Sequence, residues 1–589
     1  MNQLVSMLKY ERRVGLHKLA LLLCLTSSTS LLSMSALAVV DEQKQASNAP
    51  IAASHSALKN VPNSNQDSAI IEPAALVTPL ILELSATQQA KLISEGKLSS
   101  TALVSAYLAR IDAMDRKGPS VQSILSLNPN ALKEANQKDA DVAQGKMLGR
   151  LHGIPILVKD NIETSELPTT AGSIALAQNN TQRDAPIIAR LKAEGAIILG
   201  KTNLSQWANF RSNDSISGWS ALGGQTRNPH SLDRSPCGSS SGSGVAIAAQ
   251  FASLAIGTET NGSIICPAAM NGIVGVKPTV GLLSRTHIVP ISVTQDTAGP
   301  MTRSVEDAAL MLSIMAGTDP DDSYTTLADK HKRDYTSELK KPLNGKRIGV
   351  FTAVQGKHPA IISAFESSAK TLQALGAELV TIDEFETPEG FWDKALDVLL
   401  IEFKHELNLY LKQSAPAVKT RTLADLIEFN KTNAREMVLF DQSLFEQSQT
   451  TTGYDENYLD ILTFLQNATR KEGIDLLLAK YNVDAIIMPS QTPAFLIDPV
   501  YGDSFAGGNA GAGWLAAISG YPQVSVPMGS MKGLPVNLSF IGKAWDESLL
   551  LNLAYHFEKE SRAIIKPSFA KSAYETSYFK EAMRPMKTN

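Results

Sequence analysis

Three short segments carry the residue types that nucleophilic attack on a carbonyl group requires. They are residues 153–161 (GIPILVKDN), 237–244 (CGSSSGSG) and 257–264 (GTETNGSI). A serine hydroxyl is a poor nucleophile unless a neighbouring group takes its proton during the attack. The first segment supplies Lys159 directly after an apolar run, and the other two supply serines. Together these residues are compatible with a serine nucleophile that is served by a lysine base.

A lysine can act as a base only in its neutral form, and its ordinary pKa is about 10.4. Burial disfavours the ammonium form, so a position at the end of an apolar strand lowers the pKa. We therefore expect a lowered pKa for Lys159. The neighbouring Asp160 would oppose this shift if its carboxylate faced the ammonium. We expect that carboxylate to point elsewhere.

The three segments together resemble the amidase signature family. The second and third have the register of that family, in which the first serine of the glycine-rich loop, Ser239, precedes the nucleophile, Ser263, by 24 residues. Further segments extend the likeness to roughly residues 80–560. These segments are GVKP at 275–278, DTAGP at 296–300, GYP at 520–522 and LSFIG at 538–542.

The resemblance implies a role for each polar residue of the motifs. It makes Ser263 the nucleophile, Lys159 the base, and Ser239 the serine that bridges them, with a cis peptide bond before it. Ser240 would support the hydrogen-bond network around this triad. The expected reaction runs through an acyl-enzyme on Ser263 and needs no metal and no cofactor.

The turn that ends in the nucleophile leads from a predicted strand into a predicted helix, so consecutive backbone N–H groups can converge there. We expect these groups to form an oxyanion hole; they belong to Thr260, Asn261, Gly262 and Ser263. Fixed donors aimed at the developing negative charge are often the largest catalytic contribution, and one donor is worth roughly 3 to 4 kcal/mol.

Some positions depart from the usual family pattern. Many members carry glycine where this chain has Ser241 and Asn261, and arginine where it has Ile265. The segments PCGSSSGS at 236–243 and SIICPAA at 263–269 look most like bacterial peptide amidases, which release ammonia from the C-terminal amide of a peptide. The expected substrate is therefore a C-terminal peptide amide or a small carboxamide.

An esterase of the α/β-hydrolase type is one alternative. GSSSG at 238–242 fits the Gly-x-Ser-x-Gly elbow of those enzymes, with Ser240 as the nucleophile. That mechanism requires a histidine further along the chain. The candidates are His287, His331, His358, His405 and His556. None of them lies in a glycine-rich or turn context, which argues against this alternative.

Three other functions have weaker support: nucleotide binding, the supply of ammonia for charged tRNA, and ligand binding without catalysis. GAIILGKT at 195–202 matches the phosphate-loop pattern, but its apolar middle predicts a strand, and a strand cannot cradle phosphates. We therefore expect a structural role for Lys201. An amidotransferase A subunit, which makes ammonia for charged tRNA, carries the same signature but works in the cytoplasm. A catalytically inactive binding protein is disfavoured by the intact Lys159, Ser239 and Ser263.

The N-terminal region has the composition of a processed leader. The first 38 residues contain basic residues, then apolar residues, and they end in Ala36-Leu37-Ala38. This order predicts a signal peptide, residues 1–38, and a periplasmic or secreted protein without a stable membrane anchor. Residues 39–78 are rich in Ala, Ser, Asn and Gln and resemble a disordered linker.

Two cysteines, Cys237 and Cys266, follow the predicted leader. An oxidising compartment permits a single disulfide between them. Two buried thiols that behave as small apolar side chains are the alternative. The sequence leaves both open.

The remaining sequence predicts the elements that position the three segments. Apolar runs predict strands and apolar positions at helical spacing predict helices, in an alternating order that is typical of α/β proteins. The predicted strands are Ile154–Val158, Ala196–Leu199, Leu254–Gly257, Val483–Met488 and Val536–Ile541. The predicted helices are Leu103–Ile111, Ile187–Glu194, Val245–Ala249 and Ile264–Met270.

These elements and the resemblance imply a single large α/β/α domain, residues 79–580, with a mixed β-sheet enclosed by helices. Residues 320–470 are more polar and mostly helical in pattern, and we expect them to form a substrate-facing cover. The formal charge of the 589 residues is −4, so no global field favours nucleic acid or an anionic membrane. The expected partner is a small-molecule or peptide amide; the sequence leaves the oligomeric state open.

Overall fold

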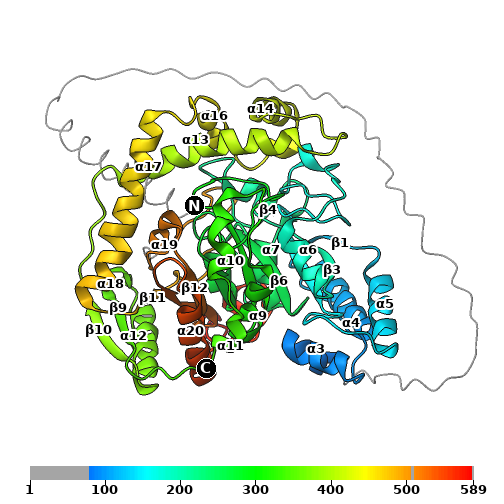
Figure 1. Cartoon of the computed structure of the whole chain (residues 1–589), viewed down its shortest axis with the longest axis horizontal. Helices are drawn as coiled ribbons and strands as arrows, with labels where there is room; N and C mark the ends of the chain where they lie inside the picture. The colour runs from blue at the N-terminus through cyan, green and yellow to red at the C-terminus, as the bar shows by residue number, and fades with distance from the viewer. Residues whose placement is uncertain (1–77, 506–509, 587–589) are drawn as a thin grey trace, which may run out of the picture. The chain divides into compact units, whose positions relative to one another are not determined.

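The computed structural model describes residues 78–505 and 510–586 (Figure 1). The predicted signal peptide and all but the last residue of the predicted linker lie outside the described residues. Within the described residues, no helix combines the length and the apolar character that crossing a bilayer requires.

An 11-stranded mixed sheet forms the centre of the domain, in the order β1-β3-β2-β6-β8-β7-β12-β13-β11-β9-β10. The strands are β1 (Ile124–Leu127), β2 (Pro155–Lys159), β3 (Ile197–Thr202), β6 (Leu254–Glu259), β7 (Val274–Lys277), β8 (Thr297–Thr302), β9 (Arg347–Phe351), β10 (Glu378–Ile382), β11 (Ala485–Pro489), β12 (Gln523–Met531) and β13 (Leu534–Ile541). The β2 strand pairs in parallel with β3 and β6, whereas β8 pairs antiparallel with β6 and β7.

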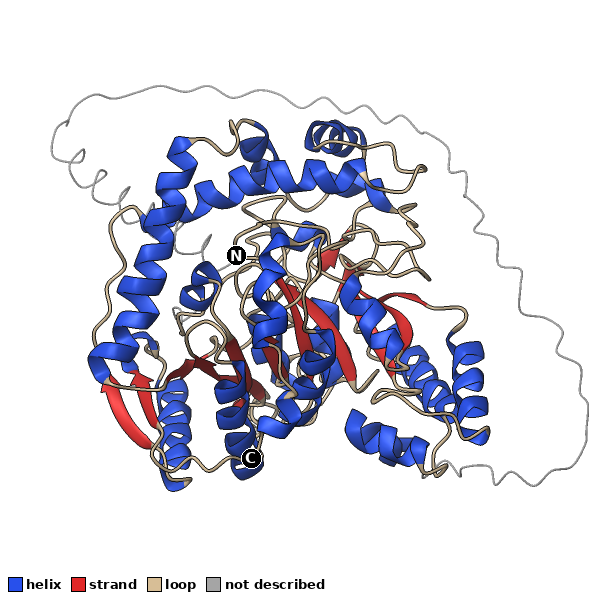
Figure 2. Cartoon of the chain, in the orientation of Figure 1, coloured by secondary structure: helices blue, strands red, loops and turns tan. Residues whose placement is uncertain are grey.

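Helices flank this sheet, as the blue and red ribbons of Figure 2 show. The helices nearest to the candidate site are α7 (Ser241–Ala248) and α8 (Ile265–Asn271), which pack against each other and on the central strands. The remaining helices that pack on the sheet or beside it include α4 (Ser100–Ile111), α5 (Ala131–Ala143), α6 (Pro186–Ala193), α9 (Val305–Met315), α12 (Pro359–Ala374) and α20 (Glu547–Ser561). The prediction of a single α/β domain with a mixed sheet among helices is confirmed.

Most of the predicted elements are present. The five predicted strands correspond to β2, β3, β6, β11 and β13, and the four predicted helices correspond to α4, α6, α7 and α8, with ends that differ by a few residues. The β3 strand occupies Ile197–Thr202, so the segment that matches a phosphate loop on paper is a strand of the sheet. The predicted strand is confirmed, and a strand cannot form a phosphate-binding loop.

The segment 320–470 contains the largest group of helices outside the sheet layers. Its helices include α13 (Phe391–Lys412), α14 (Leu423–Thr432), α16 (Ser443–Gln449) and α17 (Glu456–Thr469), which lie together along the upper and left edges of the view in Figure 1. The same segment also contributes β9 and β10, two parallel strands at the edge of the sheet. Sequence analysis did not separate these strands because each has only five residues, mixes apolar with polar or charged side chains and lacks a long apolar run.

Candidate active site

Strand order explains how the three candidate segments meet. The β2 and β6 strands are parallel neighbours, so their carboxyl ends lie at the same edge of the sheet. Lys159 is the last residue of β2, and the turn with Ser263 follows Glu259, the last residue of β6. Ser239 lies just before α7, which packs on β6. Carboxyl ends of parallel strands are where open α/β sheets bind their ligands.

Lys159 is fully buried and forms three hydrogen bonds. Its Nζ lies 2.8 Å from Ser239 Oγ, 2.7 Å from Thr258 Oγ1 and 3.2 Å from the Thr258 carbonyl oxygen. Burial lowers the pKa of Lys159 from its ordinary value of 10.5 to about 7, although the negative charges of Asp296 and Glu259 act to raise it. A large fraction of this lysine is therefore neutral near pH 7 and can accept a proton.

The Asp160 carboxylate points away from Lys159, as expected. Its Oδ2 accepts a 3.1 Å hydrogen bond from the Thr170 backbone N–H and another from the Thr170 hydroxyl. Its Oδ1 forms a buried ion pair with Lys201 Nζ at 3.2 Å. Lys201 therefore has the structural role that its sequence context predicts. It also balances the charge of Asp160, so this carboxylate does not act as a counter-ion for Lys159.

The loop that carries Ser239 approaches its neighbours too closely for a side chain at Gly238. A Cβ atom at Gly238 would lie 2.1 Å from Ser205 Oγ. The Gly238–Ser239 peptide bond is cis, as the resemblance implies. The Ser239 carbonyl oxygen accepts a 3.1 Å hydrogen bond from the Ser205 N–H. These contacts hold the Ser239 hydroxyl in reach of Lys159.

The turn around Ser263 is held by a residue that sequence analysis missed. The buried Glu259 carboxylate accepts hydrogen bonds from the backbone N–H groups of Gly262, Ile264 and Ile265 at 2.9, 2.8 and 3.0 Å. The available signal was an acidic residue just before a helix N-terminus, where a negative charge is stabilising. Glu259 thus fixes the backbone on both sides of Ser263.

The predicted oxyanion-hole residues follow one another through this turn. Gly262 adopts a left-handed backbone with φ of 79°, which favours glycine at this position. Its N–H group already donates to Glu259. To serve in the oxyanion hole, this N–H group would have to donate to the oxyanion as well. The Thr260 hydroxyl donates to Asp296 Oδ1 at 2.6 Å. The assignment of Thr260, Asn261, Gly262 and Ser263 as oxyanion donors stays a prediction.

Ser240 forms hydrogen bonds with the strand and the turn that surround the candidate triad. Its hydroxyl donates to the Thr258 carbonyl oxygen at 3.0 Å, and its backbone N–H donates to the Ser263 carbonyl oxygen at 3.1 Å. In the described part of the chain no histidine forms a hydrogen bond with Ser240, so the esterase alternative has no base at this position.

The five histidines proposed for that alternative have different environments. His331 stacks on Trp545, His358 caps α12, His405 contacts Glu406, His556 contacts the Lys341 carbonyl oxygen, and His287 lines a cavity described below.

A disulfide joins the two serine-bearing segments. Cys237 and Cys266 are bonded, with their Cα atoms 5.9 Å apart. Cys237 lies two residues before Ser239 and Cys266 lies three residues after Ser263. The structure thus decides between the two states that the sequence leaves open. In residues 78–505 and 510–586, no group of three or more His, Cys, Asp or Glu side chains is arranged to hold a metal ion.

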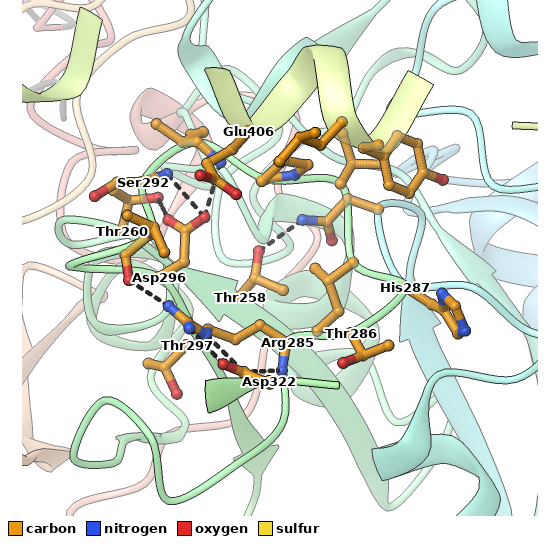
Figure 3. A pocket seen from close by; sticks show the side chains of 18 of the residues that line it. Thr258, Thr260, Arg285, Thr286, His287, Ser292, Asp296, Thr297, Asp322 and Glu406 are labelled. Atoms are coloured by element: carbon orange, nitrogen blue, oxygen red, sulfur yellow. Dashed lines mark hydrogen bonds and ion pairs between the residues drawn. The ribbon is translucent and has the colours of Figure 1, made fainter. Parts of the chain in front are cut away.

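Two cavities flank the candidate triad. The larger, shown in Figure 3, has a volume of about 610 Å³, and Asn161, Ser239, Thr258 and Thr260 form part of its wall. The smaller has a volume of about 20 Å³, and its wall includes Gly238, Asn261, Gly262 and both cysteines. Ser263 itself lines neither cavity, although its neighbours in the turn line both. The larger cavity thus touches both Ser239 and Thr260 of the predicted oxyanion turn, whereas the smaller one touches Asn261 and Gly262 of that turn.

Comparisons with known proteins agree with this arrangement. The sequence model of the amidase family matches residues 102–551. The native peptide amidase of Stenotrophomonas maltophilia has a structure that matches with a TM-score of 0.79 at 44% identity, over 83% of this chain and 99% of that chain. The probable amidase of Arabidopsis thaliana is 36% identical over 492 residues, which cover 81% of this chain and 90% of the plant protein.

Amidotransferases are also related to this chain. The glutamyl-tRNA(Gln) amidotransferase A subunit of Thermoanaerobacter pseudethanolicus is 33% identical over 492 residues, which cover 81% of this chain and 96% of the bacterial protein. The matches extend across the sheet, the lysine strand and both serine segments. The chain therefore belongs to the amidase signature family and is a hydrolase that acts on amide carbon–nitrogen bonds.

Proposed function

We propose that this chain hydrolyses C-terminal peptide amides or small carboxamides through a triad of Ser263, Ser239 and Lys159. The observation that carries the proposal is the 2.8 Å contact between Ser239 Oγ and the Nζ of a buried lysine whose pKa is about 7. Similarity to the Stenotrophomonas maltophilia peptide amidase at 44% identity supports the substrate class.

In the proposed acylation step, Ser263 Oγ attacks the amide carbon while Ser239 accepts its proton and passes its own proton to Lys159. The carbonyl oxygen becomes an oxyanion beside the backbone N–H groups of the turn from Thr260 to Ser263, and fixed donors there lower the barrier. The amide nitrogen is a poor leaving group until it is protonated, so Lys159 returns a proton to it through Ser239. The products are ammonia, or an amine, and an ester on Ser263.

In the proposed second step, water attacks the Ser263 ester and gives up a proton along the same path through Ser239 to Lys159. The carboxylic acid then leaves and the Ser263 hydroxyl is restored. Lys159 thus acts as a base and as an acid within one cycle, as a lysine with a pKa of about 7 permits near neutral pH.

Kinetics of single variants test the triad. We expect Ser263→Ala, Ser239→Ala and Lys159→Ala each to lower ammonia release from a peptide amide by about 10³-fold or more, the scale of a lost triad member. Ser367→Ala is a matched control, because it makes the same replacement at an exposed position of α12, outside the candidate site. A fluorophosphonate should label Ser263 in the wild-type protein. Label on Ser240 would contradict the proposal and support the esterase alternative.

Glutamine hydrolysis is a second candidate function, favoured by the 33% identity to an amidotransferase A subunit. The same assay distinguishes it, because ammonia release from free glutamine that exceeds release from every peptide amide would favour this candidate.

We also propose that the protein is exported and that its mature chain begins near Val39. The basic and apolar order of residues 1–38 supports export. The bond between Cys237 and Cys266 supports it independently, because disulfides persist mainly in oxidising compartments. A periplasmic or secreted location would also separate this chain from tRNA, which disfavours the amidotransferase alternative.

A further inference from the structure

Three consecutive residues at the end of β6 each make a different contact in the candidate site. Thr258 Oγ1 accepts a 2.7 Å hydrogen bond from Lys159 Nζ. Glu259 accepts hydrogen bonds from backbone N–H groups on both sides of the nucleophile. Thr260, the first residue of the turn, donates its hydroxyl to Asp296 Oδ1 at 2.6 Å. Asp296 therefore belongs to the candidate site, although the reaction proposed above gives it no role.

The register of the sheet brings Thr260 and Asp296 together. The strands β6 and β8 are antiparallel, and Glu259 at the end of β6 lies opposite Thr297 at the start of β8. Thr260 directly follows Glu259, and Asp296 directly precedes Thr297. The two residues thus face each other just beyond the paired strands, as Figure 3 shows.

The second oxygen of the Asp296 carboxylate binds the wall of the larger cavity. Its Oδ2 accepts hydrogen bonds from the backbone N–H groups of Ile291 and Ser292 at 2.7 and 3.0 Å. Both residues belong to the loop 285–293, which lines the larger cavity, as do Thr260 and Asp296 themselves. One carboxylate thus connects the turn of the nucleophile to the wall of the cavity.

The turn needs a contact at its start as well as at its end. Gly262, directly before Ser263, has a left-handed backbone with φ of 79°, and glycine leaves the backbone more conformational freedom than other residues do. The hydrogen bonds of the Glu259 carboxylate with this turn begin at Gly262. The contact between Thr260 and Asp296 fixes the part of the turn that precedes Gly262.

The negative charge of Asp296 acts on Lys159. Burial is the largest effect on the pKa of Lys159 and lowers it to about 7, while Asp296 and, to a smaller extent, Glu259 act to raise it. The neighbouring Asp160 is paired with Lys201. Asp296 is therefore the carboxylate that stabilises the Lys159 ammonium most.

The surroundings of Asp296 favour its ionised form. Burial raises the pKa of Asp296, whereas the hydrogen bonds from Thr260 and the loop and the charge of Arg285 act to lower it. Arg285 itself is paired with Asp322. In the described residues, no lysine or arginine forms an ion pair with Asp296. Its charge can therefore act on Lys159 without a direct counter-ion.

We propose that Asp296 is a positioning residue for the hydrolysis proposed above: it holds the turn of Ser263 against the wall of the larger cavity, and its negative charge acts on Lys159. The proposal rests on that hydrolysis and adds to it a residue that does not touch the reacting atoms. The hydrogen bonds of Asp296 affect the maximal rate, because they position the nucleophile. Its charge affects the pH at which the relay can accept a proton.

Thr260→Val tests the positioning effect, because it removes the hydroxyl, keeps the side-chain size and leaves the charge of Asp296 in place. We expect kcat for a peptide amide to fall about 10-fold with little change in KM, since an acceptor of Asp296 loses its donor and the nucleophile is less well placed in the transition state. Fluorophosphonate labelling of Ser263 should slow in parallel. Thr463→Val, at an exposed position of α17, is the matched control.

Asp296→Asn tests the effect of the charge. The amide oxygen can accept from the two loop N–H groups and the amide NH₂ can donate to the Thr260 hydroxyl oxygen, so the contacts are kept. We expect the midpoint of the acidic limb of kcat/KM to move about half a pH unit below that of the wild type, less than the roughly 1–3 units that a charge in close contact produces. The plateau should stay near the wild-type value. Asp460→Asn, at an exposed position of α17, is the matched control.

Asp296→Ala, alone and combined with Thr260→Val, tests whether the two side chains act through one contact. Asp296→Ala should show both the lower kcat and the lower midpoint. The double variant should be no slower than Asp296→Ala, because both substitutions remove the same hydrogen bond. Circular dichroism shows whether these variants fold, and the two isosteric variants test the proposal without them.

Three outcomes would overturn the inference and leave the proposed function intact, because the wild-type protein would still hydrolyse the peptide amide. They are unchanged kcat and labelling in Thr260→Val, losses that add fully in the double variant, and a midpoint that does not move in Asp296→Asn. Absence of amide hydrolysis by the wild type would contradict the proposed function instead. The labelling rates of Ser263 would then still decide whether Thr260 and Asp296 position this serine.

Discussion

Lys159 is completely buried, and in the described residues no carboxylate forms an ion pair with it. Lys201 forms an ion pair with the neighbouring Asp160, so that this carboxylate does not stabilise the ammonium of Lys159. Asp296 and Glu259 raise the pKa of Lys159 from a greater distance, but desolvation is the larger effect and leaves the pKa at about 7. The buried ion pair between Lys201 and Asp160 thus helps to keep the pKa of Lys159 low.

The pH dependence of catalysis follows from this pKa. The neutral amine is the active form, so kcat/KM should rise with pH and reach half of its plateau near pH 7, the pKa of Lys159. Below that pH the protonated lysine cannot accept the Ser239 proton. The measurement is a pH–rate profile on an amide that does not titrate between about pH 5 and 9, two units on either side of this pKa, with circular dichroism to show that the protein stays folded.

The Lys159→Ala variant is the control for that profile. Its residual activity should be low and should lack the acidic limb. A variant that kept near-normal rates and the same limb would show that another group titrates, and it would remove Lys159 from the mechanism.

At the scale of elements, the candidate site depends on a strand, a turn and a helix that one carboxylate connects. Glu259 ends β6 and binds the backbone on both sides of Ser263, up to the first residue of α8. A buried carboxylate that accepts three N–H groups also offsets the positive end of the helix. The position of the nucleophile is therefore set by β6 as well as by the helix that follows it.

Replacing Glu259 should lower catalysis, because this side chain holds the backbone on both sides of Ser263. In Glu259→Gln the amide NH₂ faces N–H donors and cannot accept from all three, which leaves at least one buried donor unpaired at a cost of about 1–3 kcal/mol. We expect kcat/KM to fall about 10- to 100-fold, which corresponds to a loss of that size. Fluorophosphonate labelling of Ser263 should slow in parallel, since it depends on the position of the nucleophile and not on substrate binding.

The matched control for Glu259 is Glu428→Gln, which makes the same replacement at an exposed position of α14. Unchanged labelling and turnover in Glu259→Gln, with a folded protein, would show that the turn holds its shape without this carboxylate.

The helix α13 is connected to the sheet domain by a second buried carboxylate. Glu402 of α13 accepts hydrogen bonds from Thr294 Oγ1 at 2.9 Å, from Tyr458 OH at 2.7 Å and from the Ser292 hydroxyl. Ser292 belongs to the loop that lines the larger cavity beside the candidate triad. Through these contacts α13 helps to hold that wall of the cavity in place.

At the scale of the whole molecule, the sequence predicted what short motifs determine and missed what distant contacts determine. Lys159, Ser239 and Ser263 each lie at the end of an apolar strand or in a glycine-rich turn, so local patterns locate them. The contacts of Glu402 with Ser292 and Thr294 became visible only when the structure placed α13 beside the loop that lines the larger cavity. A glutamate in a polar helix has no local pattern that assigns it to a cavity.

The disulfide links the site to the compartment in which the protein would work. Cys237 and Cys266 close a loop of about 30 residues, and the chain-entropy treatment gives such a loop roughly 3 to 4 kcal/mol of stabilisation. The bridge also ties the segment of Ser239 to the helix that follows Ser263. Reduction is therefore expected to lower both the free energy of unfolding and kcat.

Two preparations of the protein test this expectation together with export. Chain recovered from the periplasm should begin near Val39, contain the oxidised cysteine pair and unfold at higher denaturant concentration than chain kept in the cytoplasm without residues 1–38. Oxidation of the cytoplasmic material should restore both stability and turnover, because only the crosslink distinguishes the two. The Cys237→Ser, Cys266→Ser double variant should not respond to oxidation. Periplasmic protein with an intact Met1, or equal stability of the oxidised and reduced chains, would contradict the assignment.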